Sequence, residues 1–332
     1  MSVDSAAIEA AHRRIREHLI DTPLFVSEPM SERSGSTISI QAEHQQLTGS
    51  FKIRGALNKV LGLDAAQRDA GIITASSGNH GIATATAARL AGATCTVYLP
   101  ANASTAKSAT IQRLGATVVH VDSSDSYAAE QQARAAAEHR GATYVSPYND
   151  PDVVAGQGTL AIDLMNNASQ LGSERIDAVV VAVGGGGLIS GVATWLDRHL
   201  PDTLIIGASP INDRAMAASV AAGNVVAPAA RPTFSDGTAG SIEPHTITFE
   251  LCRRFVDTWI DVTEIDIATA VTAMVDDHHQ LVEGAAGVAI AAAGQFGRRH
   301  PGSTVIAVSC GANVTSTTLH QMIDTARRSE LA

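Results

Sequence analysis

Three lysines occur among the 332 residues, at positions 52, 59 and 107, against twenty arginines. Lys52 stands in the segment Ser-Phe-Lys-Ile-Arg-Gly-Ala at residues 50–56. Arginine cannot form an imine because its guanidinium stays protonated. A lysine amine can do so once burial or a neighbouring cation lowers its pKa. Lys52 is therefore the candidate for amine chemistry, whereas Lys59 and Lys107 are expected to be ordinary surface lysines.

A turn of small residues, Ser-Ser-Gly-Asn-His-Gly at residues 76–81, follows an expected strand at 71–75 and precedes an expected helix at 82–90. Ligands of open parallel sheets bind outside the carboxyl ends of the strands. The N–H groups at a helix N-terminus attract anions. The turn is therefore expected to bind a carboxylate, and Asn79 can both donate and accept hydrogen bonds there. His80 is the weaker candidate, because a histidine in such a turn often only braces the loop.

A second turn, which follows an expected strand at 177–183, contains four consecutive glycines and a leucine: Gly184, Gly185, Gly186, Gly187 and Leu188. Glycines permit positive φ angles and leave the backbone N–H groups open. Such a nest suits a phosphate monoester. The segment lacks the Gly-Lys-Ser/Thr of a P-loop and is not a clean dinucleotide fingerprint. A flexible linker is the weaker alternative, because a strand precedes the glycines and a helix follows them.

A third turn, Ser-Cys-Gly-Ala-Asn at residues 309–313, follows an expected strand at 304–309. The thiol of Cys310 could meet a ring nitrogen through a neutral hydrogen bond. Taken alone, Cys310 would be interpreted as a small buried hydrophobic residue.

Strand and helix alternate from about residue 70, which is typical of parallel strands joined by right-handed crossover helices. The Pro- and Gly-rich segment 222–244 is expected to be a long functional loop and not a domain linker. Further strands are expected at 94–99, 116–121, 142–145, 204–208 and 258–262, and further helices at 105–114, 127–139 and 158–171.

The composition excludes several classes of function. A net charge of −10 argues against nucleic acid as a partner, because phosphate binding needs a basic face. No apolar run approaches the roughly 18 residues of a membrane span, and residues 1–20 are a charged amphipathic stretch unlike a signal peptide. Cys95, Cys252 and Cys310 are odd in number and far apart, so neither a disulfide framework nor a zinc site is expected. A cytoplasmic protein is the expectation.

Taken in order, segments 50–56, 76–81 and 184–188 resemble the fold type II pyridoxal-phosphate enzymes, and among them the serine/threonine dehydratases and serine racemases. The resemblance runs from about Thr22 to Asn313. It also includes Ala-Gly-Gln-Gly-Thr at 155–159, Asp-Gly-Thr-Ala-Gly at 236–240 and Val-Glu-Gly-Ala-Ala-Gly at 282–287.

The resemblance implies an α/β fold with two open, mostly parallel sheets flanked by helices. Residues 1–68 and 148–332 would form a large cofactor-binding domain, and residues 69–147 a small mobile substrate domain. It also implies an assembly of two or four copies, a homodimer or homotetramer, that acts on a small amino-acid substrate.

The resemblance further implies pyridoxal 5′-phosphate as the cofactor, with Lys52 as the Schiff-base lysine and Phe51 beside the ring. Asn79 would contact the ring 3′-oxygen, and Cys310 occupies the place where many relatives have a serine bonded to the pyridine nitrogen. The counterpart of Glu283 in the family lies near the ring. The remaining implied residues are Gly184 to Leu188 around the cofactor phosphate, and Ser76, Ser77, Gly78, Asn79 and His80 around the substrate carboxylate.

The chain departs from metal-stimulated members of the family, which carry a glutamate and an aspartate after the strand expected at 204–208. Ser209 and Ala215 stand in these places, which leaves Asp213 nearby. Divalent cations prefer carboxylate ligands, so no metal site is expected. The chain also ends soon after the third turn, so the effector domain of biosynthetic threonine dehydratases is expected to be absent.

The implied reaction is β-elimination of a β-hydroxy amino acid, such as L-threonine or L-serine, to a 2-oxo acid and ammonia, with Lys52 removing the Cα proton. Racemisation is an alternative, because Ser77 has the position of the second base of serine racemases. Dehydration of 3-hydroxyaspartate and β-replacement are further alternatives within the family. From another class, the chain could be a noncatalytic sensor that binds an amino acid, but Lys52 speaks against it.

Overall fold

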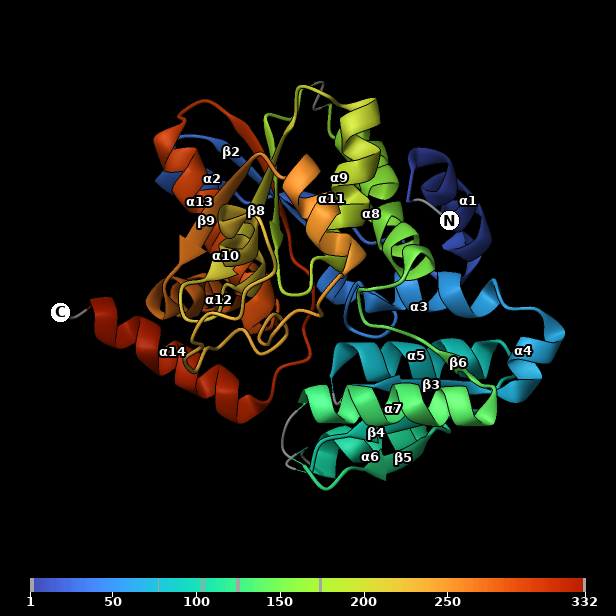
Figure 1. The fold of residues 1–332 in the computed structure, drawn as a ribbon. Coiled ribbons are helices and arrows are strands. Elements are labelled where there is room, and N and C mark those ends of the chain that lie inside the picture. Colours follow the sequence, from blue (N-terminus) through green and yellow to red (C-terminus); the bar gives the residue numbers. More distant parts are fainter. Residues whose placement is uncertain are drawn as a thin grey trace.

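The computed structural model describes residues 3–76, 78–101, 103, 105–123, 126–172 and 175–330. The strands form two separate sheets, which occupy the upper and lower parts of Figure 1. Helices flank both sheets, and all but one of the strand pairs are parallel. The expected α/β class with two open, mostly parallel sheets is therefore confirmed.

The six-stranded sheet combines both ends of the chain. Its order is β1-β2-β10-β7-β8-β9, and its β1–β2 pair is antiparallel. β7 is buried along its whole length, as its uninterrupted apolar sequence indicates. The strands are β1 (Leu24–Val26), β2 (Thr37–Gln41), β7 (Ala178–Ala182), β8 (Leu204–Pro210), β9 (Thr258–Val262) and β10 (Thr304–Val308).

The four-stranded sheet is built wholly from the middle of the chain, in the order β5-β4-β3-β6. All of its neighbouring strands are parallel. Its strands lie within the segment 69–147 that is expected to form the small domain, although the domain boundaries themselves stay a prediction. The strands are β3 (Ile72–Ala75), β4 (Cys95–Leu99), β5 (Thr117–His120) and β6 (Thr143–Tyr144).

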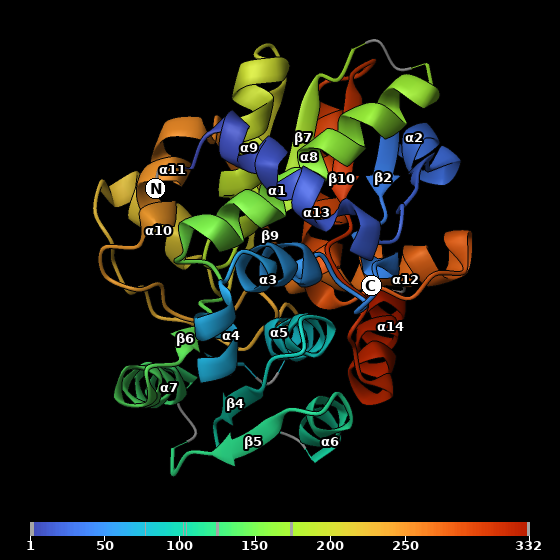
Figure 2. The same ribbon diagram turned by 90° about the vertical axis from the view of Figure 1, so that its right-hand side faces the viewer.

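Helices cover both sheets, as the two perpendicular views show (Figures 1 and 2). Among the described residues, no helix combines the length and apolar character needed to cross a membrane. The helices are α1 (Ser5–Ile15), η1 (Arg16–His18), α2 (Glu28–Ser34), η2 (Glu43–Gln45), α3 (Lys52–Leu61), α4 (Ala65–Ala70), α5 (Asn79–Leu90), α6 (Thr105–Arg113), α7 (Ser126–Arg140), α8 (Pro151–Gln170), α9 (Gly187–His199), α10 (Ala215–Ala222), α11 (Ile247–Phe255), α12 (Glu264–His278), α13 (Gly284–Arg299) and α14 (Ser316–Glu330).

The elements expected by residue range agree with the observed ones except at α5, which begins at Asn79 and not at residue 82, and at α8; no ranges were expected for β1 and β2 or for helices α1 to α4 and α9 to α14. Helix α8 begins at Pro151 and not at residue 158, because Asp150 caps it by accepting the N–H groups of Asp152 and Val153. The sequence analysis did not include β1 and β2. Residues 223–246 between α10 and α11 contain no helix or strand, so the expected long loop at 222–244 is confirmed.

Helix α3 lies against α8 so closely that glycine is required on both. A Cβ atom at Gly156 would lie 2.7 Å from the carbonyl oxygen of Arg54 and 2.7 Å from the Cα of Gly55. The apolar side of α3, which includes Ile53 and Leu57, shares a core with Ile72 of the four-stranded sheet. Helix α3 therefore lies between the two sheets, and its first residue is Lys52.

Arg54 of α3 is the centre of a buried cluster of charged side chains. Arg54 is fully buried, and its guanidinium donates to both carboxylate oxygens of Glu43, at 2.7 and 2.8 Å. It also donates to Asp163 of α8 at 2.6 Å, and Asp163 contacts His12 of α1 at 2.9 Å. Burial opposes the charge of Arg54, but the two carboxylates outweigh it and raise the pKa of the guanidinium above its ordinary value. The cluster thus joins α1, α3, α8 and η2.

We expect Glu43→Ala to lower the free energy of unfolding by about 3–5 kcal/mol, because the buried guanidinium of Arg54 loses its bidentate partner. Urea unfolding measures the change. Glu17→Ala is the matched control, since Glu17 is exposed and its removal should leave the unfolding midpoint unchanged. Equal midpoints for the two variants would show that the cluster does not hold α3.

Candidate active site

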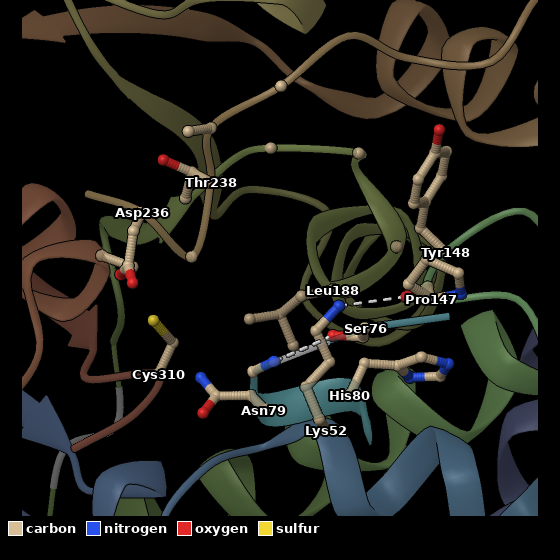
Figure 3. A pocket seen from close by; sticks show the side chains of 18 of the residues that line it. Lys52, Ser76, Asn79, His80, Pro147, Tyr148, Leu188, Asp236, Thr238 and Cys310 are labelled. Atoms are coloured by element: carbon tan, nitrogen blue, oxygen red, sulfur yellow. Dashed lines mark hydrogen bonds between the residues drawn. The ribbon is translucent and has the colours of Figure 1, made fainter. Parts of the chain in front are cut away.

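Residues of the three segments 76–81, 184–188 and 309–313 line a cavity of about 580 Å³, and Lys52 lines it as well. Figure 3 shows Lys52 reaching into it from α3, with Asn79 and Cys310 on one side and Tyr148 on the other. Ser77 lies outside the described residues. Every other predicted site residue lines the cavity: Phe51, Lys52, Ser76, Gly78, Asn79, His80, Gly184, Gly185, Gly186, Gly187, Leu188, Glu283 and Cys310.

Lys52 is held beside the third turn by the backbone. The N–H of Phe51 donates to the carbonyl of Cys310 at 3.1 Å, and the N–H of Ala312 donates to the carbonyl of Gly49 at 2.8 Å. The Lys52 amine donates to the carbonyl of Pro147 at 3.1 Å. Burial lowers the pKa of Lys52 to about 8, against the opposing effects of Cys310 and nearby carboxylates. A substantial neutral fraction of the amine is therefore present near neutral pH.

The four-glycine turn forms a concave backbone surface before α9. Gly186 has a φ of 81°, and the helix begins at the next residue. A Cβ at Gly184 would lie 2.7 Å from the carbonyl oxygen of Thr238, and one at Gly185 would lie 2.4 Å from the ring of Tyr148. Side chains are thus excluded from this surface, and the N–H groups at the start of α9 are available to an anion such as a phosphate.

A second helix N-terminus lies at the cavity, because α5 begins at Asn79, within the segment that was expected to be a turn. The Oγ of Ser76 accepts the N–H of Gly78 at 3.2 Å. Burial first, and then Lys52, lower the pKa of His80 to about 3, so its ring is neutral. Its Nε2–H donates to the carbonyl of Val145 at 3.0 Å, so the side chain braces the loop. Substrate binding by His80 stays a prediction.

Asn79 and Glu283 join the two sheets across the cavity wall. The Asn79 amide donates to both oxygens of Glu283, at 2.8 and 3.1 Å. Asn313 donates through its backbone N–H to Glu283 at 3.2 Å and through its side-chain amide to the side-chain Oδ1 of Asn79 at 2.6 Å. Glu283 precedes α13 and is buried. These contacts fix the orientation of the Asn79 amide.

Cys310 presents a neutral thiol to the cavity. Its side chain is buried, and burial followed by the charge of Glu283 raises its pKa well above the ordinary value. A thiol in this state can donate a weak hydrogen bond or contact an uncharged ring nitrogen without protonating it. The neutral thiol is compatible with the expected hydrogen bond between Cys310 and the ring nitrogen of the cofactor, and that hydrogen bond stays a prediction.

The sequence analysis missed several residues of the cavity wall. Tyr148 follows β6 and could have been found from the rule that ligands bind beyond the carboxyl ends of parallel strands. Glu130 and Tyr127 lie on α7 and face the cavity through tertiary packing alone, so no local sequence pattern marks them. Asn313, which contacts Asn79 and Glu283 without being among the residues that line the cavity, was included in the third turn without a role.

Ser209 and Asp213, near the place of the missing metal-binding carboxylates, make local hydrogen bonds. Among the described residues, no group of three or more His, Cys, Asp or Glu side chains is arranged to hold a metal ion. Ser209 is buried in β8, and its hydroxyl donates to the carbonyl of Val183 at 3.5 Å. Asp213 accepts the N–H of Gly240 at 2.8 Å, and this contact holds the 223–246 loop.

Residues 15–311 match the family described as "Pyridoxal-phosphate dependent enzyme". This chain belongs to that family. The expected resemblance is confirmed, and so is pyridoxal phosphate as the cofactor.

Relatives with different activities resemble the chain to similar degrees. An L-threonine ammonia-lyase of Thermotoga maritima is 36% identical over 86% of this chain and 69% of its own length. A beta-hydroxyaspartate dehydratase of Paracoccus denitrificans is 37% identical over 79% of this chain and 80% of its own length. The structure of maize serine racemase has a TM-score of 0.89 at 29% identity and covers 100% of both chains.

The residues present fit pyridoxal phosphate. The glycine turn at 184–187 leaves a side-chain-free surface for the phosphate. The amine of Lys52 lies in the same cavity, where it could attach to the aldehyde carbon, and Cys310 offers a neutral partner for the ring nitrogen. When bound, the cofactor supplies an electron sink for negative charge at the substrate Cα.

We expect Gly185→Ala to raise the dissociation constant for pyridoxal phosphate at least about tenfold. The added methyl group would lie 2.4 Å from the Tyr148 ring, so either the ring or the phosphate-binding turn must move. Absorbance titration of the cofactor-free protein measures the constant. In the control Gly294→Ala the nearest atoms lie at 3.5 Å or more, so cofactor affinity should be retained. An unchanged constant for Gly185→Ala would place the phosphate elsewhere.

We expect covalent attachment of the cofactor to the cofactor-free protein to accelerate with rising pH up to about 8 and then level off. The neutral amine is the nucleophile, and burial lowers the pKa of Lys52 from 10.5 to about 8. Rapid-mixing absorbance at a series of pH values measures the rate, with Nα-acetyllysine as the reference amine. A rate that keeps rising in parallel with the reference would contradict the lowered pKa.

Proposed function

We propose that the chain is an ammonia-lyase that eliminates the β-hydroxyl group of an L-amino acid such as serine or threonine, giving a 2-oxo acid and ammonia. One observation carries the proposal. The Lys52 amine lies between two helix N-termini, one suited to a phosphate and the other to a carboxylate. That arrangement would bring the cofactor, the substrate and a base into one cavity.

Lys52 is the proposed base for the Cα proton. Its lowered pKa provides the neutral form that can accept a proton, and the same residue anchors the cofactor before the substrate binds. The Pro147 carbonyl accepts a hydrogen bond from the amine and keeps it directed into the cavity. These contacts support a positioned base, as general base catalysis requires.

The substrate α-carboxylate is assigned to the turn at 76–81, where α5 adds positive potential and small side chains allow close approach. Cys310, as a neutral partner, would leave the ring nitrogen unprotonated. That supports prompt loss of the β-hydroxyl over long-lived charge on the ring. We also propose that residues 69–147 form the small substrate domain and that the chain forms a homodimer or homotetramer.

Racemisation is the second candidate, supported by the similarity to maize serine racemase over the whole chain. It needs a second base on the face opposite Lys52, for which Ser77 is proposed. Chiral chromatography of reactions with L-serine separates the two activities: D-serine indicates racemisation, and a 2-oxo acid with ammonia indicates elimination.

We expect Lys52→Ala to lose covalent attachment of pyridoxal phosphate and essentially all turnover, because one amine serves as both anchor and base. The measurements are intact mass after borohydride reduction and 2-oxo acid release from a panel of 3-hydroxy amino acids. Lys59→Ala is the control, since Lys59 forms ion pairs with Asp150 and Asp152 outside the cavity lining. Attachment and turnover that persist in Lys52→Ala would end the proposal.

A further inference from the structure

The backbone N–H groups of the glycine turn, from Gly184 to Leu188, have no acceptor among the described residues. They are the groups that would bind the cofactor phosphate, because N–H groups at a helix N-terminus attract anions. Such a site requires that each peptide unit keeps its N–H directed towards the anion. Between two glycines no side chain restricts the orientation of the peptide, so a contact from outside the turn is needed to hold it.

Thr248 of α11 makes such a contact. Its hydroxyl donates to the carbonyl of Gly185 at 2.7 Å. Thr248 is fully buried and is not among the residues that line the cavity, so its hydrogen bond reaches the turn from the side that faces away from the ligand. Helix α11 packs beside α9, the helix that follows the turn (Figure 1).

The hydrogen bond from Thr248 determines where the next N–H points. The carbonyl of Gly185 and the N–H of Gly186 belong to one planar trans peptide, in which the two groups point in opposite directions. A Cβ atom at Gly186 would lie 3.1 Å from the Cβ of Thr248 and 3.0 Å from the Sγ of Cys252, which also lies outside the cavity lining. Because the Gly185 carbonyl is directed towards this buried side, the N–H of Gly186 is directed towards the cavity.

Thr246 holds the Thr248 hydroxyl in turn. Thr248 has a single hydroxyl proton, which it donates to Gly185, so the Thr246 hydroxyl at 2.8 Å must be the donor to the Thr248 oxygen. Thr246 occupies the N-cap of α11, where a threonine side chain usually accepts an N–H of the first helical turn. Its side chain makes no such bond. The two buried hydroxyls therefore form a chain of hydrogen bonds that ends at the glycine turn.

From this arrangement we infer that Thr248 is a positioning residue for the cofactor phosphate. Its hydroxyl holds the peptide between Gly185 and Gly186 with the N–H towards the phosphate. Without the hydroxyl, the peptide is free to rotate between the two glycines, and its carbonyl oxygen would then face the phosphate and repel it. The inference rests on the placement of the phosphate at the glycine turn, and not on the reaction that follows.

Thr248→Val tests the inference, because it removes the hydroxyl and keeps the branched shape of the side chain. Absorbance titration of the cofactor-free full chain gives the dissociation constants of pyridoxal phosphate and of pyridoxal, which lacks the phosphate. We expect the constant for pyridoxal phosphate to rise about tenfold, because a buried carbonyl loses its donor and the turn loses its orientation. The constant for pyridoxal should change less than about twofold.

Phosphorus NMR of the holoenzyme gives a second measurement that does not depend on affinity. The resonance of the bound phosphate reports the hydrogen bonds that the phosphate accepts. In Thr248→Val we expect it to shift towards the resonance of free pyridoxal phosphate. An unchanged resonance would contradict the inference.

Thr194→Val is the matched control. Thr194 is buried, and its hydroxyl also donates to a backbone carbonyl at 2.7 Å, but that carbonyl belongs to Ser190 within α9. Its removal should leave the ratio of the two constants unchanged. Thr248→Ser keeps the donor and should return the constant for pyridoxal phosphate to within about twofold of the wild type.

Equal weakening of the two ligands in Thr248→Val would show a general structural role and would overturn the inference. Wild-type binding of both ligands, or a failure of Thr248→Ser to restore affinity, would overturn it as well. Misfolding of Thr248→Val would weaken both ligands alike, so the ratio of the constants separates it from the specific loss that we expect.

The comparison with Gly185→Ala separates the role of Thr248 from the placement of the phosphate. If Gly185→Ala weakens cofactor binding and Thr248→Val does not, the phosphate lies at the turn and the role of Thr248 is wrong. If neither weakens it, the phosphate lies elsewhere and both are wrong. None of these measurements depends on turnover, so an absence of ammonia release would reject the proposed elimination and leave the role of Thr248 standing.

Discussion

The buried contact of Arg54 with Glu43 and Asp163 determines where the first turn of α3 lies, and the active cavity depends on that turn. Arg54 and Lys52 are two residues apart and both lie within the protein. Arg54 keeps its charge because two carboxylates pair with it. The Lys52 amine contacts a carbonyl instead, so burial lowers its pKa. One helical turn therefore carries a guanidinium that stays charged in its ion pairs and an amine that can become neutral. Arginine suits the first position because its guanidinium stays protonated, and lysine suits the second because its amine can lose a proton.

The sequence predicted those features that follow from chain direction and local chemistry. Parallel strands place their carboxyl ends at one edge of a sheet, so each of the turns after β3, β7 and β10 could be predicted to face a ligand site. That the three turns share one cavity was implied by the family resemblance, because β3 belongs to a different sheet from β7 and β10. The glycine turn at 184–187 was interpretable for the same reason, since only small residues allow phosphate to approach a helix N-terminus. These predictions needed no knowledge of tertiary contacts.

The features that the sequence did not reveal depend on contacts between distant segments. Helix α8 begins seven residues before the expected position, at the Asp150 cap, and it includes Gly156 and Gly158, each of which lies where another helix approaches closely. Strand β2 was missed because it buries Ser39 and Gln41 among apolar neighbours. Glu130 was missed because its direction is set by the packing of α7 on the four-stranded sheet through Ala129 and its neighbours.

Two carboxylates, Glu283 and Glu243, lie on opposite sides of the cavity. Each accepts a hydrogen bond from a helix that flanks the four-stranded sheet. Glu283, beside α13, accepts from Asn79 of α5. Glu243, in the 223–246 loop, accepts from Arg134 of α7, and its own N–H donates to the Tyr148 hydroxyl at 2.9 Å. Because the Tyr148 ring packs on the glycine turn at 184–187, the second connection reaches that turn as well. Any displacement of α7 relative to the six-stranded sheet must therefore disturb the packing of Tyr148 on the glycine turn, which is the surface that the fit to pyridoxal phosphate depends on.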